Sequence, residues 1–312
     1  MSRSSFDRPH PGGDRPTGRE LGSGAAASLI EQQFPTLAPA SLQELGGGWD
    51  NVTFLVNRLY VFKFPRSSAT ARFLMTEGRL LRHIARVVPV EVPRFVARGR
   101  PTAGFHFPFL GYRMLPGNPA CAIPMTIGAR IALARPIGRF LAALHRIPAA
   151  RARRWGAPDD RMGRLDPSIR IAEAHANLDK LVSVGLVRDN CSLRRVIDSL
   201  SGAGRARLAL VHGDLYSRHL VLNSRSGLTA VIDWGETHVG DRALDLSLAF
   251  SFLPPEARPK LMSSYGQTTS EEIARARFRA VWHTLHNLVC AVQANDDELA
   301  AESLVALDFS VS

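Results

Sequence analysis

Three short β-type runs interrupt the helical second half of this chain, and they constrain its fold more than any other feature. The runs are apolar, whereas most of the surrounding sequence shows helical spacing; they cover residues 208–211, 220–222 and 229–232. Three ionisable residues, Asp214, His219 and Asp233, lie at the edges of these runs. Each of them alone is explained by a turn or a cap. Together they predict a site, because a charge buried without a partner is costly.

The first third of the chain has a different pattern, which predicts a small separate lobe. Short runs rich in Val, Phe and Tyr predict strands, with a helix between the third and fourth; the strands cover residues 42–45, 52–56, 59–64, 94–97 and 107–114, and the helix residues 70–85. The run Pro116-Gly117-Asn118-Pro119 breaks any regular element and predicts the boundary. We therefore expect an α+β fold with a disordered tail at 1–22, a β-rich lobe at 23–115 and a helical lobe with an embedded hairpin at 116–312.

The net charge of the chain indicates which kinds of molecule it can bind. The net charge is +11, from 39 Lys and Arg against 28 Asp and Glu, which favours anionic partners such as nucleotides. Aromatic residues make up 7% of the chain, too few for an extensive base-stacking surface, and the Arg-rich run 146–170 is typical of a solvated face. We therefore expect no nucleic-acid partner, and either a monomer or a homodimer.

The same sequence favours a cytoplasmic protein. No apolar run approaches the roughly 20 residues of a membrane span, and the polar N-terminus lacks the apolar core of a secretory signal. The three cysteines, Cys121, Cys191 and Cys290, lie far apart, which argues against a disulfide framework.

The spacing of the ionisable residues matches phosphoryl-transfer machinery. In kinases a catalytic Asp precedes a metal-binding residue by five positions, and a metal-binding Asp follows in a later turn. Here Asp214 and His219 are five residues apart, and Asp233-Trp234-Gly235 follows 19 residues after Asp214. In the first lobe, Lys63 ends a predicted strand and Glu77 lies in the next helix. Their pairing would hold the lysine against nucleotide phosphates.

These motifs resemble the aminoglycoside phosphotransferase-like kinases, a branch of the protein-kinase-like fold that includes aminoglycoside, macrolide and choline kinases. The resemblance covers about residues 42–250; its most specific motifs are His212-Gly213-Asp214, Ile232-Asp233-Trp234-Gly235 and Gly240-Asp241-Arg242-Ala243-Leu244-Asp245. It implies a bilobal fold with a small β-rich N-lobe and a larger helical C-lobe. It also implies a phosphotransferase that uses Mg²⁺ as cofactor and ATP or GTP as donor.

The resemblance implies roles for the matching positions. Asp214 is the expected catalytic base or hydroxyl-orienting carboxylate, Asp233 the magnesium ligand, and Lys63, paired with Glu77, the phosphate contact. The remaining nucleotide-binding positions are a phosphate-covering loop with Gly48 and Asn51, and a hinge formed by Arg113, Met114 and Leu115 that reads the purine.

Three further residues are expected to have structural roles. Asp241 is expected to cap the helix at 242–250, and His212 to brace the catalytic loop. His145 lies on an apolar helix face and is expected to be a hydrogen-bonded core histidine.

One position departs from the family pattern. Most members carry Asn at the second metal position, whereas this chain has His219, as the macrolide phosphotransferase branch does. Imidazole suits softer metals better than Mg²⁺, which prefers oxygen ligands. His219 therefore either ligates a metal or supports a single-metal arrangement, and we favour the ligand.

The sequence says least about the acceptor, the molecule that would receive the phosphate. A polycationic aminoglycoside needs clustered carboxylates, for which Glu236, Asp296 and Asp297 are candidates, although a solvated helix start explains the last two equally well. A macrolide needs a wide apolar groove; residues 250–253 and 282–289 could form its wall, or simply helix core.

Three functions therefore stay open. The first is an antibiotic O-phosphotransferase for macrolides or aminoglycosides. The second is a kinase for a metabolic alcohol of choline or homoserine type. The third is a non-catalytic nucleotide-binding protein, against which the set Lys63, Glu77, Asp214 and Asp233 argues.

Overall fold

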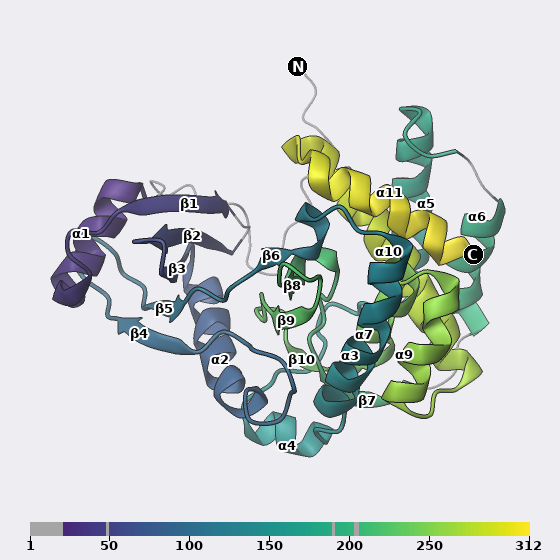
Figure 1. Ribbon diagram of the computed structural model, residues 1–312, viewed down its shortest axis with the longest axis horizontal. Helices are drawn as coiled ribbons and strands as arrows, with labels where there is room; N and C mark the ends of the chain where they lie inside the picture. The colour runs from purple at the N-terminus through teal and green to yellow at the C-terminus, as the bar shows by residue number, and fades with distance from the viewer. Residues whose placement is uncertain (1–20, 48–49, 189–190, 203–205) are drawn as a thin grey trace. The chain divides into compact units, whose positions relative to one another are not determined.

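In a computed structural model the chain forms two compact units (Figure 1). The structure describes residues 21–47, 50–188, 191–202 and 206–312. The first unit contains the described residues up to 82 together with 93–115, and the second contains 83–92 together with 116–312. The predicted α+β fold is confirmed, with a β-rich first unit and a helical second unit. Almost all of the predicted tail lies outside the described residues.

The first unit is built on one antiparallel sheet of five strands in the order β1-β2-β3-β5-β4. The strands are β1 (Leu42–Gly47), β2 (Asn51–Val56), β3 (Tyr60–Pro65), β4 (Phe95–Gly99) and β5 (Phe109–Arg113). Asn57 and Arg58 join β2 to β3 with φ angles of 52° and 57°, the left-handed pair that a tight hairpin turn requires.

Aromatic packing holds this sheet against helix α1 (Ser23–Gln33), which is followed by the short 3-10 helix Pro35–Leu37. Phe62, Phe64 and Phe109 are fully buried beside Ala26 and Ile30 of α1. The rings of Phe64 and Phe109 stack with their centroids 4.5 Å apart. Helix α2 (Ser68–Ile84) follows β3 and carries Glu77.

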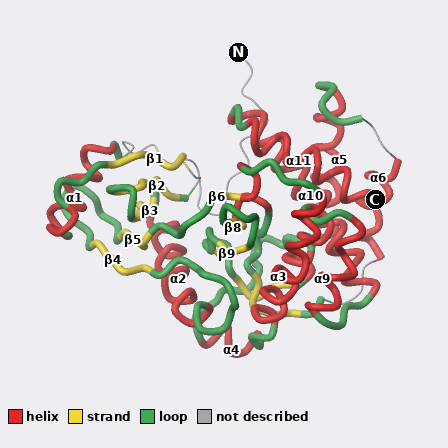
Figure 2. Tube along the Cα trace, in the orientation of Figure 1, coloured by secondary structure: helices red, strands yellow, loops and turns green. Residues whose placement is uncertain are grey.

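The second unit is mainly helical (Figure 2). Its helices are α3 (Ile127–His145), α4 (Ala149–Arg154), α5 (Pro167–Ser183), α6 (Cys191–Asp198), α7 (Ala243–Leu246), α8 (Leu248–Ser251), α9 (Arg258–Tyr265), α10 (Ser270–Ala294) and α11 (Asp297–Val311), with 3-10 turns at Ala120–Ala122, Ser199–Gly202, Ser217–His219 and Pro255–Ala257. A core of Phe278, Val281 and Leu285 of α10 packs against Leu178 of α5 and Ile197 of α6. None of the described helices is long and apolar enough to span a membrane.

Helix α10 begins at Ser270, directly after a capping residue, Thr269. The Thr269 hydroxyl accepts a hydrogen bond from the Glu272 backbone N–H, and the Glu272 carboxylate accepts one from the Thr269 backbone N–H. This reciprocal capping box satisfies two backbone donors at the helix start. The helix expected at 242–250 is instead divided into α7 and α8.

The expected embedded hairpin is present at residues 220–231, but the β segments of the second unit form two sheets rather than this hairpin alone. Strand β7 (Leu208–Val211) pairs antiparallel with β10 (His238–Asp241), whereas β8 (Leu220–Leu222) pairs with β9 (Leu228–Val231) and with the short β6 (Asn118–Pro119). β10 contains only one large apolar residue, Val239, so its sequence carries no strand signal. The segment 212–219 therefore passes from one sheet to the other.

Candidate active site

Asp245 anchors the segment that follows β7. Its carboxylate is fully buried and accepts hydrogen bonds from the backbone N–H groups of His212 at 2.7 Å and Gly213 at 2.9 Å. Gly213 has φ +85°, and a Cβ there would lie 2.6 Å from the Glu236 carbonyl oxygen, so only glycine fits. These contacts hold the backbone immediately before Asp214, so they position its carboxylate.

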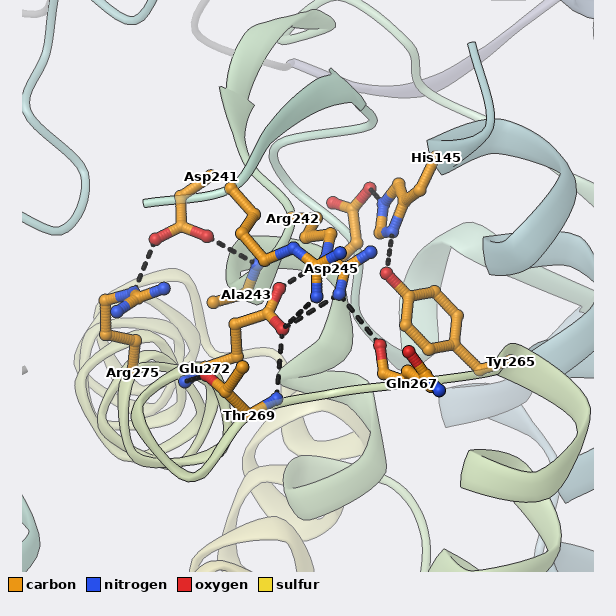
Figure 3. A network of polar contacts seen from close by, with 11 residues as sticks. His145, Asp241, Arg242, Ala243, Asp245, Tyr265, Gln267, Thr269, Glu272 and Arg275 are labelled. Carbon is orange, nitrogen blue, oxygen red and sulfur yellow. Dashed lines mark hydrogen bonds and ion pairs between the residues drawn. The ribbon is translucent and has the colours of Figure 1, made fainter. Parts of the chain in front are cut away.

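A second histidine joins this anchor (Figure 3). Nε2 of His145 lies 3.1 Å from Asp245, and Nδ1 lies 2.8 Å from the Tyr265 hydroxyl. Burial alone would raise the pKa of Asp245, but the hydrogen bonds from His145 and the loop amides outweigh burial and lower it. In the neutral ring Nε2–H donates to the carboxylate and Nδ1 accepts from the hydroxyl. His145 is thus the hydrogen-bonded core histidine that the sequence predicts.

Asp214 lies between two buried cationic or basic side chains of α10. Its Oδ1 is 3.0 Å from Nε2 of His283 and 3.7 Å from the Arg279 guanidinium, and its side chain is 32% exposed. Burial by itself raises the pKa of Asp214, but the hydrogen bond from His283 and the neighbouring charges hold it well below its ordinary value. The carboxylate is therefore ionised at neutral pH.

The pKa values of the two α10 residues are lowered as well, but here burial is the main cause. Burial, with the nearby Arg279 charge, lowers the pKa of His283 to about 4. Burial also lowers the pKa of Arg279 to about 10. At neutral pH His283 is thus a neutral ring that donates a hydrogen bond to Asp214, and Arg279 remains charged.

Sequence reasoning included Asp245 in a motif without giving it a role, and it did not single out Arg279 or His283. Arg279 and His283 are four residues apart, so they lie on the same face of α10, in a segment whose apolar residues indicate core. Trp282 between them has Arg170 and Arg279 over its ring, at 5.0 and 4.6 Å from the centroid. The sequence signal that could have identified Arg279 and His283 is their spacing of four residues within an otherwise apolar helix.

His219 and Asp233 approach each other at the two ends of the β8–β9 hairpin. His219 Nδ1 donates to the Asp214 backbone carbonyl at 2.6 Å, which leaves Nε2 3.4 Å from Oδ2 of Asp233. Asp233 has φ +62°, a left-handed conformation that its short polar side chain tolerates. Burial alone would lower the pKa of His219, but Asp233 outweighs burial and raises it.

His219 and Asp233 together fit a divalent cation whose remaining ligands come from water or a bound phosphate. Among the described residues no group of three or more His, Cys, Asp or Glu side chains could hold a metal. Mg²⁺ typically takes one or two protein ligands and completes its shell with phosphate oxygens and water. The Nδ1 hydrogen bond of His219 fixes its orientation and directs Nε2 to the side of Asp233, as second-shell partners of metal-bound histidines do.

His212 links this hairpin to the loop that carries Asp214. It is fully buried, its Nε2 donates to the Ile232 carbonyl at 3.0 Å, and its Nδ1 accepts from the Asp214 backbone N–H at 3.4 Å. Asp241 accepts from the Ala243 backbone N–H at 3.0 Å at the start of α7. The expected bracing by His212 is present. The expectation that Asp241 is the cap is wrong, because Asp241 ends β10 and the N-cap residue of α7 is Arg242, although the Asp241 carboxylate still bonds the first helical N–H.

In the first unit, Lys63 and Glu77 form the ion pair that the sequence predicts. Nζ of Lys63 lies 2.9 and 3.2 Å from the two carboxylate oxygens of Glu77, and both side chains are buried. Asn51 at the start of β2 has a buried Oδ1 without a hydrogen-bond partner among the described residues, an acceptor that is available to a ligand. Gly48 lies outside the described residues.

The predicted hinge lies at the end of β5. Arg113 and Met114 are exposed and Leu115 is half-buried. The Met114 backbone N–H donates to the Leu59 carbonyl at 2.7 Å. This contact fixes the direction in which the chain leaves the sheet.

The predicted acceptor carboxylates differ in their surroundings. Glu236 is ion-paired with Arg164. Asp296 is ion-paired with Arg218 and caps α11 by accepting from the Leu299 backbone N–H at 3.0 Å. Asp297 is exposed in the first turn of α11.

A polar pocket lies beside His283 in the second unit. It is lined by Tyr216, Ser217, His283, Thr284, Asn287, Glu302 and Ser303, among others. Its carboxylate, Glu302, is bonded through both oxygens to the buried guanidinium of Arg130, at 2.8 and 2.6 Å. The pocket next to the Asp214 partner is therefore polar but has a neutralised carboxylate.

Comparison of the sequence and the structure with known proteins identifies a family and similar solved structures. Residues 41–281 match the sequence model of a family described as the phosphotransferase enzyme family, APH. The GDP and kanamycin complex of APH(2")-IIIa is similar in structure, with a TM-score of 0.66 and 25% sequence identity over 91% of this chain and 97% of that chain.

Two other solved structures share the fold at lower identity. The macrolide 2'-phosphotransferase MphH from Brachybacterium faecium, an apoenzyme, has a TM-score of 0.60 and 21% identity over 91% of this chain and 97% of that one. ADP-bound APH(2'')-Ib has a TM-score of 0.58 and 20% identity over 91% and 98% of the two chains.

Proposed function

The chain belongs to the phosphotransferase enzyme family, and we propose that it transfers the γ-phosphate of ATP or GTP to a hydroxyl group of a small molecule. The observation that carries this proposal is the surroundings of Asp214. A carboxylate kept ionised by His283 and Arg279, on a loop anchored by Asp245, is suited to orient an acceptor hydroxyl. Its low pKa fits a transfer in which the hydroxyl proton leaves late.

The remaining residues have supporting roles in this proposal. Lys63, held by Glu77, contacts the nucleotide phosphates, with Asn51 and the Gly48 loop covering them and residues 113–115 contacting the base. Asp233 and His219 would hold Mg²⁺. Such a cation neutralises negative charge on the phosphates.

We further propose that the acceptor is an antibiotic, and that a macrolide fits better than an aminoglycoside. The structural likeness to a kanamycin complex supports an antibiotic, as does the fold shared with a macrolide 2'-phosphotransferase. The charges favour the macrolide, because two of the three candidate carboxylates, Glu236 and Asp296, each have an arginine partner. Of the three candidates, Asp297 alone is exposed. An aminoglycoside carries several ammonium groups that need carboxylates.

The test is a coupled assay of nucleoside diphosphate release. ATP and GTP are supplied separately with Mg²⁺, and macrolides, aminoglycosides, choline and homoserine are supplied as acceptors. Release stimulated by an acceptor supports a phosphotransferase and names the acceptor class. Asp214→Ala should lose this release by about a thousandfold or more while nucleotide affinity changes only a few-fold.

Asp308→Asn is the matched control, because Asp308 is an exposed carboxylate of α11. It should keep wild-type turnover. An Asp214→Ala enzyme with near-normal kcat would overturn the role of Asp214. Nucleotide binding without stimulation by any acceptor would instead favour the non-catalytic alternative.

A further inference from the structure

A second pocket of the helical unit lies away from Asp214, where α3 ends and β7 begins. It is lined by Ala142, His145, Arg146, Arg207, Arg242, Tyr265 and Gln267. Neither Asp214 nor the predicted metal ligands line it. Three of its seven lining residues are arginines, so its chemistry differs from that of the pocket beside His283.

The positive charge in this pocket exceeds the carboxylate charge that faces it. The carboxylate of Glu272 is fully buried and binds the Arg242 guanidinium through both oxygens, with the Gln267 carbonyl accepting from the same guanidinium at 2.9 Å. Arg207 reaches the same carboxylate only at 3.5 Å. One carboxylate thus balances Arg242 and leaves the charge of Arg207 weakly compensated.

Arg146 adds a further guanidinium that is available to a ligand. Its side chain is exposed and has no hydrogen-bond or ion-pair partner within the part of the chain that the structure describes. Arg207 is also open to solvent, with 51% of its side chain exposed. Both guanidiniums can therefore turn donor groups toward a molecule in the pocket.

The other acidic groups nearby are held by different partners, as Figure 3 shows. Asp245 accepts from His145 and from two loop amides. Asp241 is ion-paired with Arg275 at 2.6 Å. Neither carboxylate is available to neutralise Arg146 or Arg207.

We propose that this pocket binds a phosphate group, with Arg146 and Arg207 as its charged ligands. A guanidinium presents its N–H donors in a planar fork that matches two phosphate oxygens, and a phosphate dianion compensates two guanidiniums. Arg242 is held by Glu272 and Gln267, so it lines the pocket as a fixed side chain whose charge Glu272 already balances. The proposal does not depend on the reaction at Asp214.

The experiment measures the binding of inorganic phosphate to the full chain by calorimetry, at constant ionic strength set with chloride and without nucleotide or divalent cation. The test variant is Arg146→Gln/Arg207→Gln. The control is Arg195→Gln/Arg225→Gln, which removes the same charge from two exposed arginines elsewhere in the same unit. Unchanged far-UV circular dichroism and melting temperature in chloride show that both variants fold.

We expect the wild-type chain and the control to bind phosphate alike, and the test variant to bind it more weakly by about tenfold or more. A phosphomonoester such as glycerol phosphate forms a second arm. Equal binding of both compounds indicates that a phosphorylated metabolite can occupy the pocket. Binding of inorganic phosphate alone identifies the free phosphate ion as the ligand. Equal affinity in test and control variants, or no binding to the wild-type chain, would overturn the proposal.

Discussion

Nε2 of His283 lies 3.0 Å from Oδ1 of Asp214, although the two residues belong to a helix and a loop that are far apart in the chain. In the proposed reaction His283 is a positioning residue, since its N–H holds one carboxylate oxygen and the other would face the acceptor hydroxyl. It also stabilises the ionised form of Asp214.

The first prediction concerns this hydrogen bond. His283→Ala should lower kcat by about tenfold to a hundredfold, because a misplaced carboxylate no longer orients the acceptor. The KM for the nucleotide should change little. Removing the N–H donor also raises the pKa of Asp214, so the acid limb of the kcat profile should move to higher pH. His283→Asn, which keeps an N–H donor, should recover part of both effects; equal losses in Ala and Asn variants would argue against an orienting hydrogen bond.

The second prediction separates the structural and the chemical roles of the Lys63–Glu77 pair. Lys63→Met alone leaves the Glu77 carboxylate buried without its cation and should destabilise the fold by about 3–5 kcal/mol. The double variant Lys63→Met/Glu77→Leu should regain most of that stability, because paired apolar replacements of a buried ion pair are often neutral. Both variants should lose kcat and nucleotide affinity together, measured beside urea unfolding. A double variant that regains activity along with stability would show that Lys63 does not contact the phosphates.

The third prediction uses the pH dependence of stability at Asp245. Its pKa is lowered in the folded state, so its stabilisation is present above the unfolded-state pKa of about 3.9 and is lost as pH falls through the lower folded-state value. Asp245→Asn should therefore cost about 3 kcal/mol at pH 7. The difference from wild type should shrink in urea unfolding below about pH 4. A constant difference across this range, with Asp308→Asn unchanged throughout, would mean that the charge of Asp245 contributes nothing.

The fourth prediction concerns the metal preference. His219→Asn replaces an imidazole nitrogen with an amide oxygen, which suits Mg²⁺ better than Mn²⁺. The ratio of Mg²⁺-supported to Mn²⁺-supported turnover should therefore rise relative to wild type. His219→Ala should lower turnover with both cations. An unchanged ratio in His219→Asn would indicate that His219 only supports the Asp214 carbonyl and does not ligate the metal.

Much of the site was predictable from motifs that are short in sequence. The spacing of Asp214, His219 and Asp233 and the Lys63–Glu77 pair depend on a few neighbouring elements, and the structure brings these partners together. The carboxylates predicted to bind the acceptor were harder to interpret. The arginine partners of Glu236 and Asp296 come from other parts of the second unit, so their charge compensation has no local signal.

The sequence by itself determined the elements that local chemistry specifies, such as the hairpin turn at Asn57-Arg58 and the start of α10 at its capping box. Only the tertiary structure decided that β7 pairs with β10, that Asp245 holds the loop before Asp214, and that α10 brings His283 to Asp214. The physical reason is that turns and caps are stabilised by neighbours in the chain. Buried polar contacts between distant segments form only when the whole core packs, and they leave no periodic trace in the sequence.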